Sequence, residues 1–134
     1  MQRDFFQILV FDECSQKFRR ILSFVLYHSI SLTYEVIDAA GVIHASMIGD
    51  QIAESAIKNN WAGIVVNGCV RDVGELKNLP IGIFAKGVIP QKTSKNNHGF
   101  EDVLISFGSV VMTSGKWIYI DQNGWLVADN KLEL

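Results

Sequence analysis

Three charged residues, Asp50, Arg71 and Asp72, have types and a spacing that could bind and activate a small acid. Asp50 starts the run DQIAESAIKNN, which has a helical pattern, and Arg71-Asp72 follows the apolar run GIVVNGCV. The start of a helix has free amides and a positive dipole end, which bind a carboxylate. A guanidinium suits a carboxylate or a carbonyl oxygen that becomes an enolate, and one aspartate with waters and a chelating substrate can hold Mg²⁺.

The elements between Asp50 and Arg71 must bring these residues together. Residues 50–59 as a helix run about 15 Å, and residues 63–67 as a strand run back about 16 Å. The helix start and the strand end therefore return to one edge of the fold, where open α/β sheets place their ligands. Taken singly, an aspartate at a helix start is more often a cap, and an Arg-Asp pair is more often an exposed salt bridge. The spacing alone therefore names no substrate.

Length and composition are typical of one globular domain over residues 1–134. Hydrophobic residues make up 49% and charged residues 19%, which argues against disorder, and the net charge of −2 gives no field that would attract nucleic acid directly.

Cys14 and Cys69 form no CxxC motif and predict a reducing, cytoplasmic setting. The apolar runs near the N-terminus are too short to span a bilayer and show no signal-peptide pattern, so we expect a soluble protein with no membrane partner.

The remaining pattern predicts an α/β half followed by an antiparallel half. The segment 42–48 stays undecided between strand and helix. The elements expected in the first half are a strand at 5–11, a helix from Ser15 to about Val25, a strand at 31–38, a turn at Ala39-Ala40-Gly41, the helix at 50–59 ending at Asn59-Asn60, the strand at 63–67, a short helix at 72–77 and a strand at 81–86. Those expected in the second half are short strands at 103–107, 109–113, 117–121 and 125–128, the last two joined by the hairpin signal Asn123-Gly124.

Other residues that could do chemistry lack a partner at a useful spacing. No histidine has the spacing of a metal site or a catalytic triad, and Cys69 has no base nearby in sequence, which is typical of a small buried residue. Three lysines could line a substrate entrance, although a solvated basic surface is their more common role. The histidines are His28, His44 and His98, and the lysines are Lys86, Lys92 and Lys95.

Three runs of the sequence together resemble the regulator of ribonuclease activity A (RraA-like) family. They are GDQIAESAIKNNWAGIVVNGCVRDVGEL, LPIGIFAKGVIPQKTSK and DVLISFGSVVMTSGKWIYIDQNGWLVAD. The resemblance covers roughly Val36 to Asp129, and residues 1–35 are divergent. It implies a swivelling β/β/α three-layer domain of the α/β class, with a parallel central sheet, an antiparallel sheet and helices on one side. It also implies a homotrimer with sites between subunits.

The family includes class II 4-hydroxy-4-methyl-2-oxoglutarate aldolases, and their pattern of Asp, 20 residues and Arg-Asp falls on Asp50, Arg71 and Asp72. The resemblance implies that Arg71 contacts the 2-oxo oxygen of the substrate and that Asp72 carries a divalent metal cation, Mg²⁺ or Mn²⁺. It implies that Asp50 positions a water that shuttles protons. The substrate carboxylate would be held by the amides at the helix start, those of Gly49, Asp50, Gln51 and Ile52.

The function implied is a metal-dependent lyase that acts on small 2-oxo acids. It would cleave substrates of the 4-hydroxy-4-methyl-2-oxoglutarate type to pyruvate by a retro-aldol reaction, and it would decarboxylate oxaloacetate through the same enolate. The alternative is a non-catalytic protein that binds and regulates ribonuclease E or another partner. Family members that lack the metal-binding aspartate look like such binding proteins, whereas this chain has Asp72.

Overall fold

The structure is a computed structural model, and it describes residues 20–28, 30–94, 99–120 and 125–133. Within these residues no helix is long and apolar enough to cross a membrane. In chain order the elements are β1 (Arg20–His28), β2 (Ile30–Ile48), α1 (Asp50–Lys58), β3 (Trp61–Val70), α2 (Val73–Leu76), β4 (Gly82–Val88), β5 (Phe100–Glu101), β6 (Ile105–Phe107), β7 (Val110–Met112), β8 (Trp117–Ile120) and β9 (Trp125–Ala128).

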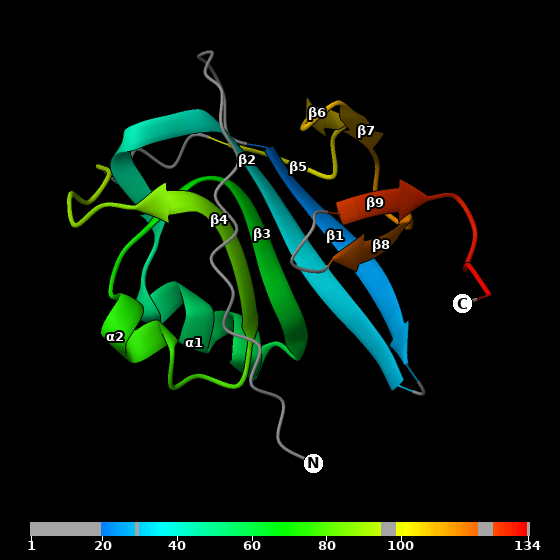
Figure 1. Ribbon diagram of the computed structural model, residues 1–134, viewed down its shortest axis with the longest axis horizontal. Helices are drawn as coiled ribbons and strands as arrows, with labels where there is room; N and C mark the ends of the chain where they lie inside the picture. Colours follow the sequence, from blue (N-terminus) through cyan, green and yellow to red (C-terminus); the bar gives the residue numbers. More distant parts are fainter. Residues whose placement is uncertain (1–19, 29, 95–98, 121–124, 134) are drawn as a thin grey trace.

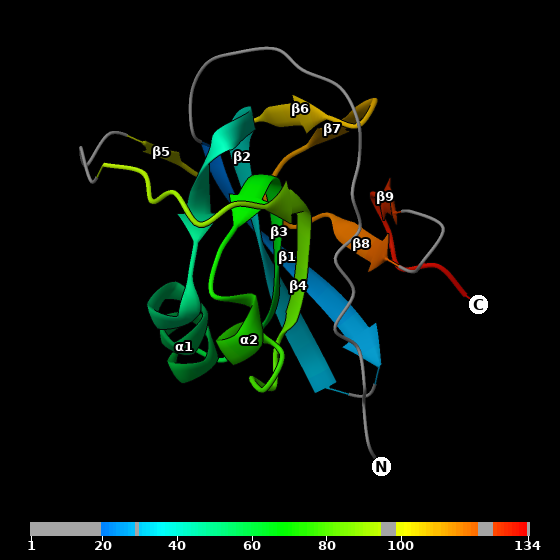
Figure 2. The same ribbon diagram turned by 60° about the vertical axis from the view of Figure 1, so that its left-hand side comes forward.

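The architecture has three layers around a five-stranded sheet with the order β4-β3-β2-β1-β5 (Figure 1). Strands β2, β3 and β4 are parallel, β1 is antiparallel to β2, and β5 is parallel to β1. Helices α1 and α2 lie on one side of this sheet and the antiparallel pairs β6-β7 and β8-β9 lie on the other, as Figure 2 shows. The expected α/β class with helices on one side is confirmed, but the described antiparallel strands form two separate pairs rather than one sheet.

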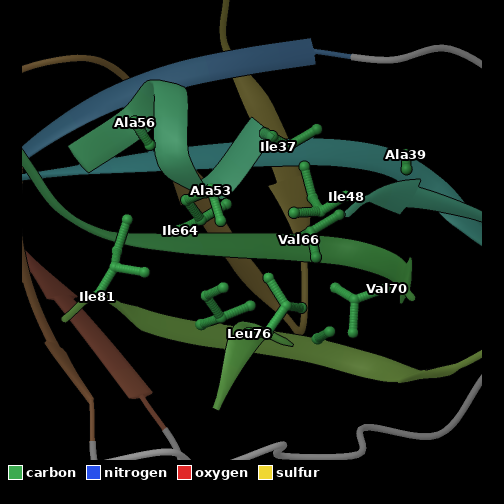
Figure 3. Close-up of a cluster of buried hydrophobic side chains, with 12 residues drawn as sticks. Ile37, Ala39, Ile48, Ala53, Ala56, Ile64, Val66, Val70, Leu76 and Ile81 are labelled. Carbon is green, nitrogen blue, oxygen red and sulfur yellow. The ribbon is translucent and has the colours of Figure 1, made fainter. Parts of the chain in front are cut away.

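Side chains of β3 alternate between two hydrophobic cores, one on each face of the sheet. Ile64 and Val66 pack with the helix residues Ala53 and Leu76 (Figure 3), whereas Val65 packs toward the antiparallel pairs. A strand covered on both faces needs apolar residues at successive positions, which explains the continuous apolar run in β3.

The largest correction concerns the predicted helix from Ser15 to Val25. Its described part, from Arg20 onward, lies in β1, which pairs with β2 without interruption from Arg20↔Asp38 to His28↔Ile30. Long-range pairing therefore decides the conformation, because the apolar run is rich in residues that also suit a strand. The strand expected at 5–11 lies outside the described residues.

The turn expected at Ala39-Ala40-Gly41 is also wrong, because β2 continues through it to Ile48. The undecided segment 42–48 is therefore strand. Ala40 and Gly41 have positive φ angles of 56° and 67°, and they form an irregular bulge inside β2. Asp38 is paired with Asn67 and Ile48 with Val70, so ten residues of β2 advance beside three of β3. This bulged part of β2 leads directly into α1.

The other predicted elements agree with the structure within a few residues. Helix α1 ends where Asn60 adopts a left-handed φ of 62°, as expected for an asparagine at a helix end. Strand β3, helix α2 and strand β4 occupy the predicted segments, and the short strands of the second half form β6 to β9. Strands β8 and β9 pair as a hairpin predicts, while the signal Asn123-Gly124 itself lies outside the described residues.

Candidate active site

The start of α1 and the end of β3 lie side by side at the carboxyl edge of the parallel strands. The backbone amide of Arg71 donates to the carbonyl of Ile48 at 2.9 Å, which ties the residue after β3 to the residue before Gly49. Gly49 is the N-cap of α1 and has extended backbone angles. The lengths of the helix and the strand therefore do bring the start of α1 and the end of β3 to one edge of the sheet, as expected.

The side chain of Asp72 joins the two predicted parts of the site. Its Oδ2 atom lies 3.3 Å from Nε of Arg71, and it accepts a hydrogen bond of 3.3 Å from the backbone amide of Asp50. The side chain of Arg71 is 16% exposed and that of Asp72 is 35% exposed. The structure therefore brings Asp50, Arg71 and Asp72 together, with the carboxylate of Asp72 reachable from solvent.

Gly49 makes this close packing possible because it has no side chain. A Cβ atom at position 49 would lie 2.5 Å from Oδ2 of Asp72 and 2.7 Å from both Cζ and Nη2 of Arg71. Real Cβ atoms do not approach other atoms so closely. The two charged side chains therefore pack directly over the backbone of Gly49, where α1 begins.

The backbone at Asp72 has a left-handed conformation, with φ 57° and ψ 40°. This region is strained for most residues, although aspartate and asparagine tolerate it better than others. The carbonyl of Asp72 accepts hydrogen bonds from the amides of Glu75 and Leu76, which start α2. The sharp change of direction after β3 thus aims the Asp72 carboxylate back at α1 rather than at its own helix.

Two amides at the start of α1 already donate to carboxylates of the protein. The amide of Asp50 donates to Asp72, and that of Gln51 donates to Oδ1 of Asp50 at 2.7 Å. Gln51 and Ile52 are exposed. The helix start therefore shows the affinity for carboxylates that the sequence predicts, and a substrate carboxylate would compete with a 3.3 Å contact at Asp50.

Ser46 also contacts Arg71, and sequence reasoning missed it. Its Oγ accepts a hydrogen bond of 3.3 Å from Nη1 of Arg71, and the residue is fully buried. A single serine between Ala45 and Met47 in an undecided segment carries no signal of this kind. The contact depends on the bulge of β2, which spacing alone does not predict.

The donor set fits a hard divalent cation held by one carboxylate. The described part of the chain contains no group of three or more His, Cys, Asp or Glu side chains that could share a metal. Asp72 presents a partly exposed carboxylate at the helix start. Mg²⁺ and Mn²⁺ are commonly bound by one or two carboxylates together with waters and oxygen atoms of a substrate, so the residues present fit such an ion.

Among the described residues, Cys69 and His44 do not join this site. Cys69 is buried, and burial raises the pKa of its thiol, an effect that the nearby charge of Lys86 partly opposes. A thiol with a raised pKa is a poor nucleophile at neutral pH. His44 is exposed on the bulge of β2, the side chain of His28 is not described, and His98 lies outside the described residues.

Fold and site together define a mixed α/β domain with Asp50, Arg71 and Asp72 clustered at the carboxyl edge of its parallel strands. The chain belongs to the RraA-like family, since the family description "Aldolase/RraA" matches residues 25–127. A curated relative from Cupriavidus taiwanensis is 46% identical over 98 residues and is named "Putative 4-hydroxy-4-methyl-2-oxoglutarate aldolase". The match covers 73% of this chain and 59% of that protein, so the chain spans about three fifths of the relative's length.

Two solved structures also resemble the chain. One is described as the RNA-processing inhibitor RraA from Thermus thermophilus, with a TM-score of 0.69 and 32% identity over 73% of this chain and 60% of that chain. The other is described as an S-adenosylmethionine:2-dimethylmenaquinone methyltransferase from Geobacillus kaustophilus, with a TM-score of 0.73 and 30% identity over 86% and 79% of the two chains. These relatives carry three different functional names, so the function must be argued from the site.

Proposed function

We propose that this chain is a divalent-metal-dependent lyase for small 2-oxo acids. It would cleave 4-hydroxy-4-methyl-2-oxoglutarate or a similar acid to pyruvate, and it would decarboxylate oxaloacetate. The observation that carries the proposal is the convergence of the Asp50 amide, the Arg71 guanidinium and the Asp72 carboxylate over Gly49. The name of the Cupriavidus taiwanensis relative supports the same reaction class.

Binding of the substrate would begin at the start of α1. The amides of residues 49–52 and the positive dipole end suit the carboxylate of a 2-oxo acid. Arg71 lies beside this helix start with its side chain 16% exposed, so its guanidinium can donate to the adjacent 2-oxo oxygen without being fully solvated. A substrate held at both groups has its C2 carbonyl aimed at Arg71.

Arg71 would act when the C3–C4 bond of the substrate breaks. In the retro-aldol reaction a base removes the proton of the C4 hydroxyl, the C3–C4 bond breaks, and its electron pair moves to the 2-oxo oxygen of the pyruvate enolate. The guanidinium stabilises this negative charge because it is already oriented before the reaction. A bound divalent cation, held by Asp72, would supply further polarisation of the carbonyl.

Asp50 would take part in the proton transfer to the enolate. Its Oδ1 accepts from the amide of Gln51, so the side chain is held at the helix start and its other oxygen can orient a water. Such a water could protonate C3 of the enolate to give pyruvate. Decarboxylation of oxaloacetate gives the same enolate and needs the same final proton.

Pyruvate release tests the proposal directly. Wild-type protein should release pyruvate from both substrates with Mg²⁺ or Mn²⁺, and chelation should abolish turnover. Arg71→Lys should retain the fold but lose most of the rate, because an ammonium cannot reproduce the planar fork. Absence of metal-dependent turnover with either substrate would overturn the proposal.

The homotrimer with sites between subunits, implied by the family, is part of the same proposal. Gln51 and Ile52 are exposed beside the site in the single chain, which leaves room for a second copy. Light scattering of the protein in solution should then give three times the monomer mass. A monomer with full turnover would show that the site needs no partner subunit.

Regulation of a ribonuclease is the second candidate function. It is favoured by the 32% identity to a protein described as an RNA-processing inhibitor. Submicromolar binding to ribonuclease E that survives Asp72→Asn, in a protein without turnover, would support this function. Metal-dependent turnover that is lost in Asp72→Asn would support the lyase instead.

A further inference from the structure

Ser46 lies where the bulged end of β2 meets the chain after β4. Its amide donates to the carbonyl of Gln91 at 2.7 Å, and its own carbonyl accepts from the amide and the hydroxyl of Thr93 at 3.4 and 3.2 Å. Ser46 also forms a parallel bridge with Lys92. The residue is fully buried and its backbone is fixed from one side by this segment.

The hydroxyl of Ser46 has a defined direction. It donates its single proton to the carbonyl of Gln91 at 3.0 Å, because a carbonyl can only accept. The lone pairs of Oγ are therefore left for Nη1 of Arg71, which donates at 3.3 Å. The chain of hydrogen bonds runs from the guanidinium through Ser46 to a backbone carbonyl, and no member of it can reverse its role.

Arg71 is consequently held at two points of its planar fork. Nε is paired with Asp72 and Nη1 with Ser46, while Nη2 packs over Gly49 next to the start of α1. The ion pair between Nε and Asp72 alone would leave the plane of the guanidinium free to turn about the side-chain bonds of Arg71. Two contacts at different nitrogen atoms fix the plane, so Nη2 is presented to the helix start.

We infer that Ser46 is a positioning residue that orients the Arg71 guanidinium for the 2-oxo group of the substrate, an inference that rests on the proposed lyase function. Ser46 is fully buried, so we expect it to act through Arg71 rather than by touching the substrate. Ser46 should stabilise the transition state more than the bound substrate, because an oriented donor is most valuable where negative charge develops. The loss of the hydroxyl should therefore lower kcat more than it raises KM.

The test compares Ser46→Ala with Thr93→Val. Both variants remove one hydroxyl from the same junction, but the hydroxyl of Thr93 bonds to the backbone of Ser46 and not to Arg71. We expect Ser46→Ala to lower kcat about tenfold to a hundredfold with KM changed less than about threefold. Thr93→Val should keep kcat within about twofold. In an Arg71→Lys background, Ser46→Ala should change kcat less than about twofold, because the group that it positions is gone.

Ser46→Ala should still fold. The carbonyl of Gln91 keeps the 2.7 Å bond from the Ser46 amide, so no buried acceptor is left without a partner. We expect Tm to stay within about 5 °C of the wild type. A structural readout is NMR of the guanidinium, in which rotation about the Cζ–Nη1 bond of Arg71 should become severalfold faster in Ser46→Ala and should not change in Thr93→Val.

The outcomes separate the two claims. A wild type that turns over substrate, with Ser46→Ala equally active or Thr93→Val equally damaged, would overturn the positioning role and leave the lyase proposal standing. A wild type without turnover would overturn the lyase proposal, and the NMR measurement would then decide whether Ser46 holds Arg71. Unchanged Nη1 rotation in Ser46→Ala would overturn the inference in either case.

Discussion

Replacing Gly49 with alanine should disable the site while leaving the fold intact. The added Cβ would lie 2.5 Å from Oδ2 of Asp72 and 2.7 Å from Cζ of Arg71. Ordinary contacts begin at 3.4 Å, so the carboxylate oxygen must move by about 0.9 Å and the guanidinium carbon by about 0.7 Å. Both atoms are at the far ends of flexible side chains, which can move away without displacing the backbone.

The expected size of the effect follows from these displacements. A misplacement of about 1 Å in a catalytic group can lower the rate about a hundredfold, so we expect kcat/KM to fall by that order. The stability change is small because two effects oppose each other. Alanine is a poorer N-cap than glycine by about 0.5–1 kcal/mol, whereas it reduces the entropy of the unfolded chain by about 0.4–1 kcal/mol. The backbone of Gly49, at φ −133°, adds no strain.

Pyruvate release and thermal unfolding of Gly49→Ala measure the two effects separately, and Gly74→Ala is the matched control. A Cβ at Gly74 would meet no atom within 4 Å, so this variant should keep wild-type kcat/KM and Tm or gain slightly in stability. Wild-type turnover in Gly49→Ala would refute the reasoning, because Arg71 and Asp72 would then not need their places over the helix start. A large fall in Tm would show that the displaced atoms include backbone.

Three further predictions concern the metal, the sheet and the pH. Asp72→Asn should abolish metal-dependent pyruvate release with little change in Tm, since asparagine tolerates the φ of 57°, whereas Asp72→Ala should also lose about 1–2 kcal/mol of stability in urea unfolding. Asn67→Ala, which removes the 2.8 Å bond to Asp38 at the bulge of β2, should lower the unfolding free energy by about 1–2 kcal/mol. Burial, and secondly the charge of Glu101, raises the pKa of Glu35 above its ordinary value of 4.5, so the folded state retains a proton that the unfolded state loses. The folded protein therefore becomes less stable, relative to the unfolded chain, as the pH rises from about 4.5 through the raised pKa of Glu35. Glu35→Gln removes this effect, so it should raise Tm at pH 7.5 but not at pH 4.

The sequence pattern predicted α1 and β3 well, but it predicted β1 and the bulged part of β2 poorly. Helix α1 has a helical pattern and a clear end at Asn60, strand β3 is a continuous apolar run, and both lie where the sequence predicts them. Strand β1 was predicted as helix because its apolar run suits either state, and only its pairing with β2 decides between them. The bulge of β2 looked like a turn because Ala40 and Gly41 do have the backbone of one, inside a strand that continues.

The candidate site was predictable where it depends on element lengths. A helix and a strand of similar length return to one edge whatever their side chains, so Asp50, Arg71 and Asp72 could be placed together from spacing alone. Two features of the site could not be predicted from the sequence pattern, because they depend on atomic detail. They are the left-handed backbone of Asp72 and the contacts of the α1 amides with carboxylates of the protein.

Ser46 connects the irregular part of β2 to the candidate active site. A regular β2 would pair residue for residue with β3, whereas the bulge allows Ser46 to pair with Cys69 and to face the segment after β4 at the same time. The hydroxyl then contacts Nη1 of Arg71, whereas Asp72 contacts Nε. The left-handed residues Ala40 and Gly41, which make the bulge possible, are therefore linked through Ser46 to the orientation of the guanidinium. A strained bulge that does not itself contact Arg71 can persist because it determines where that charged group points.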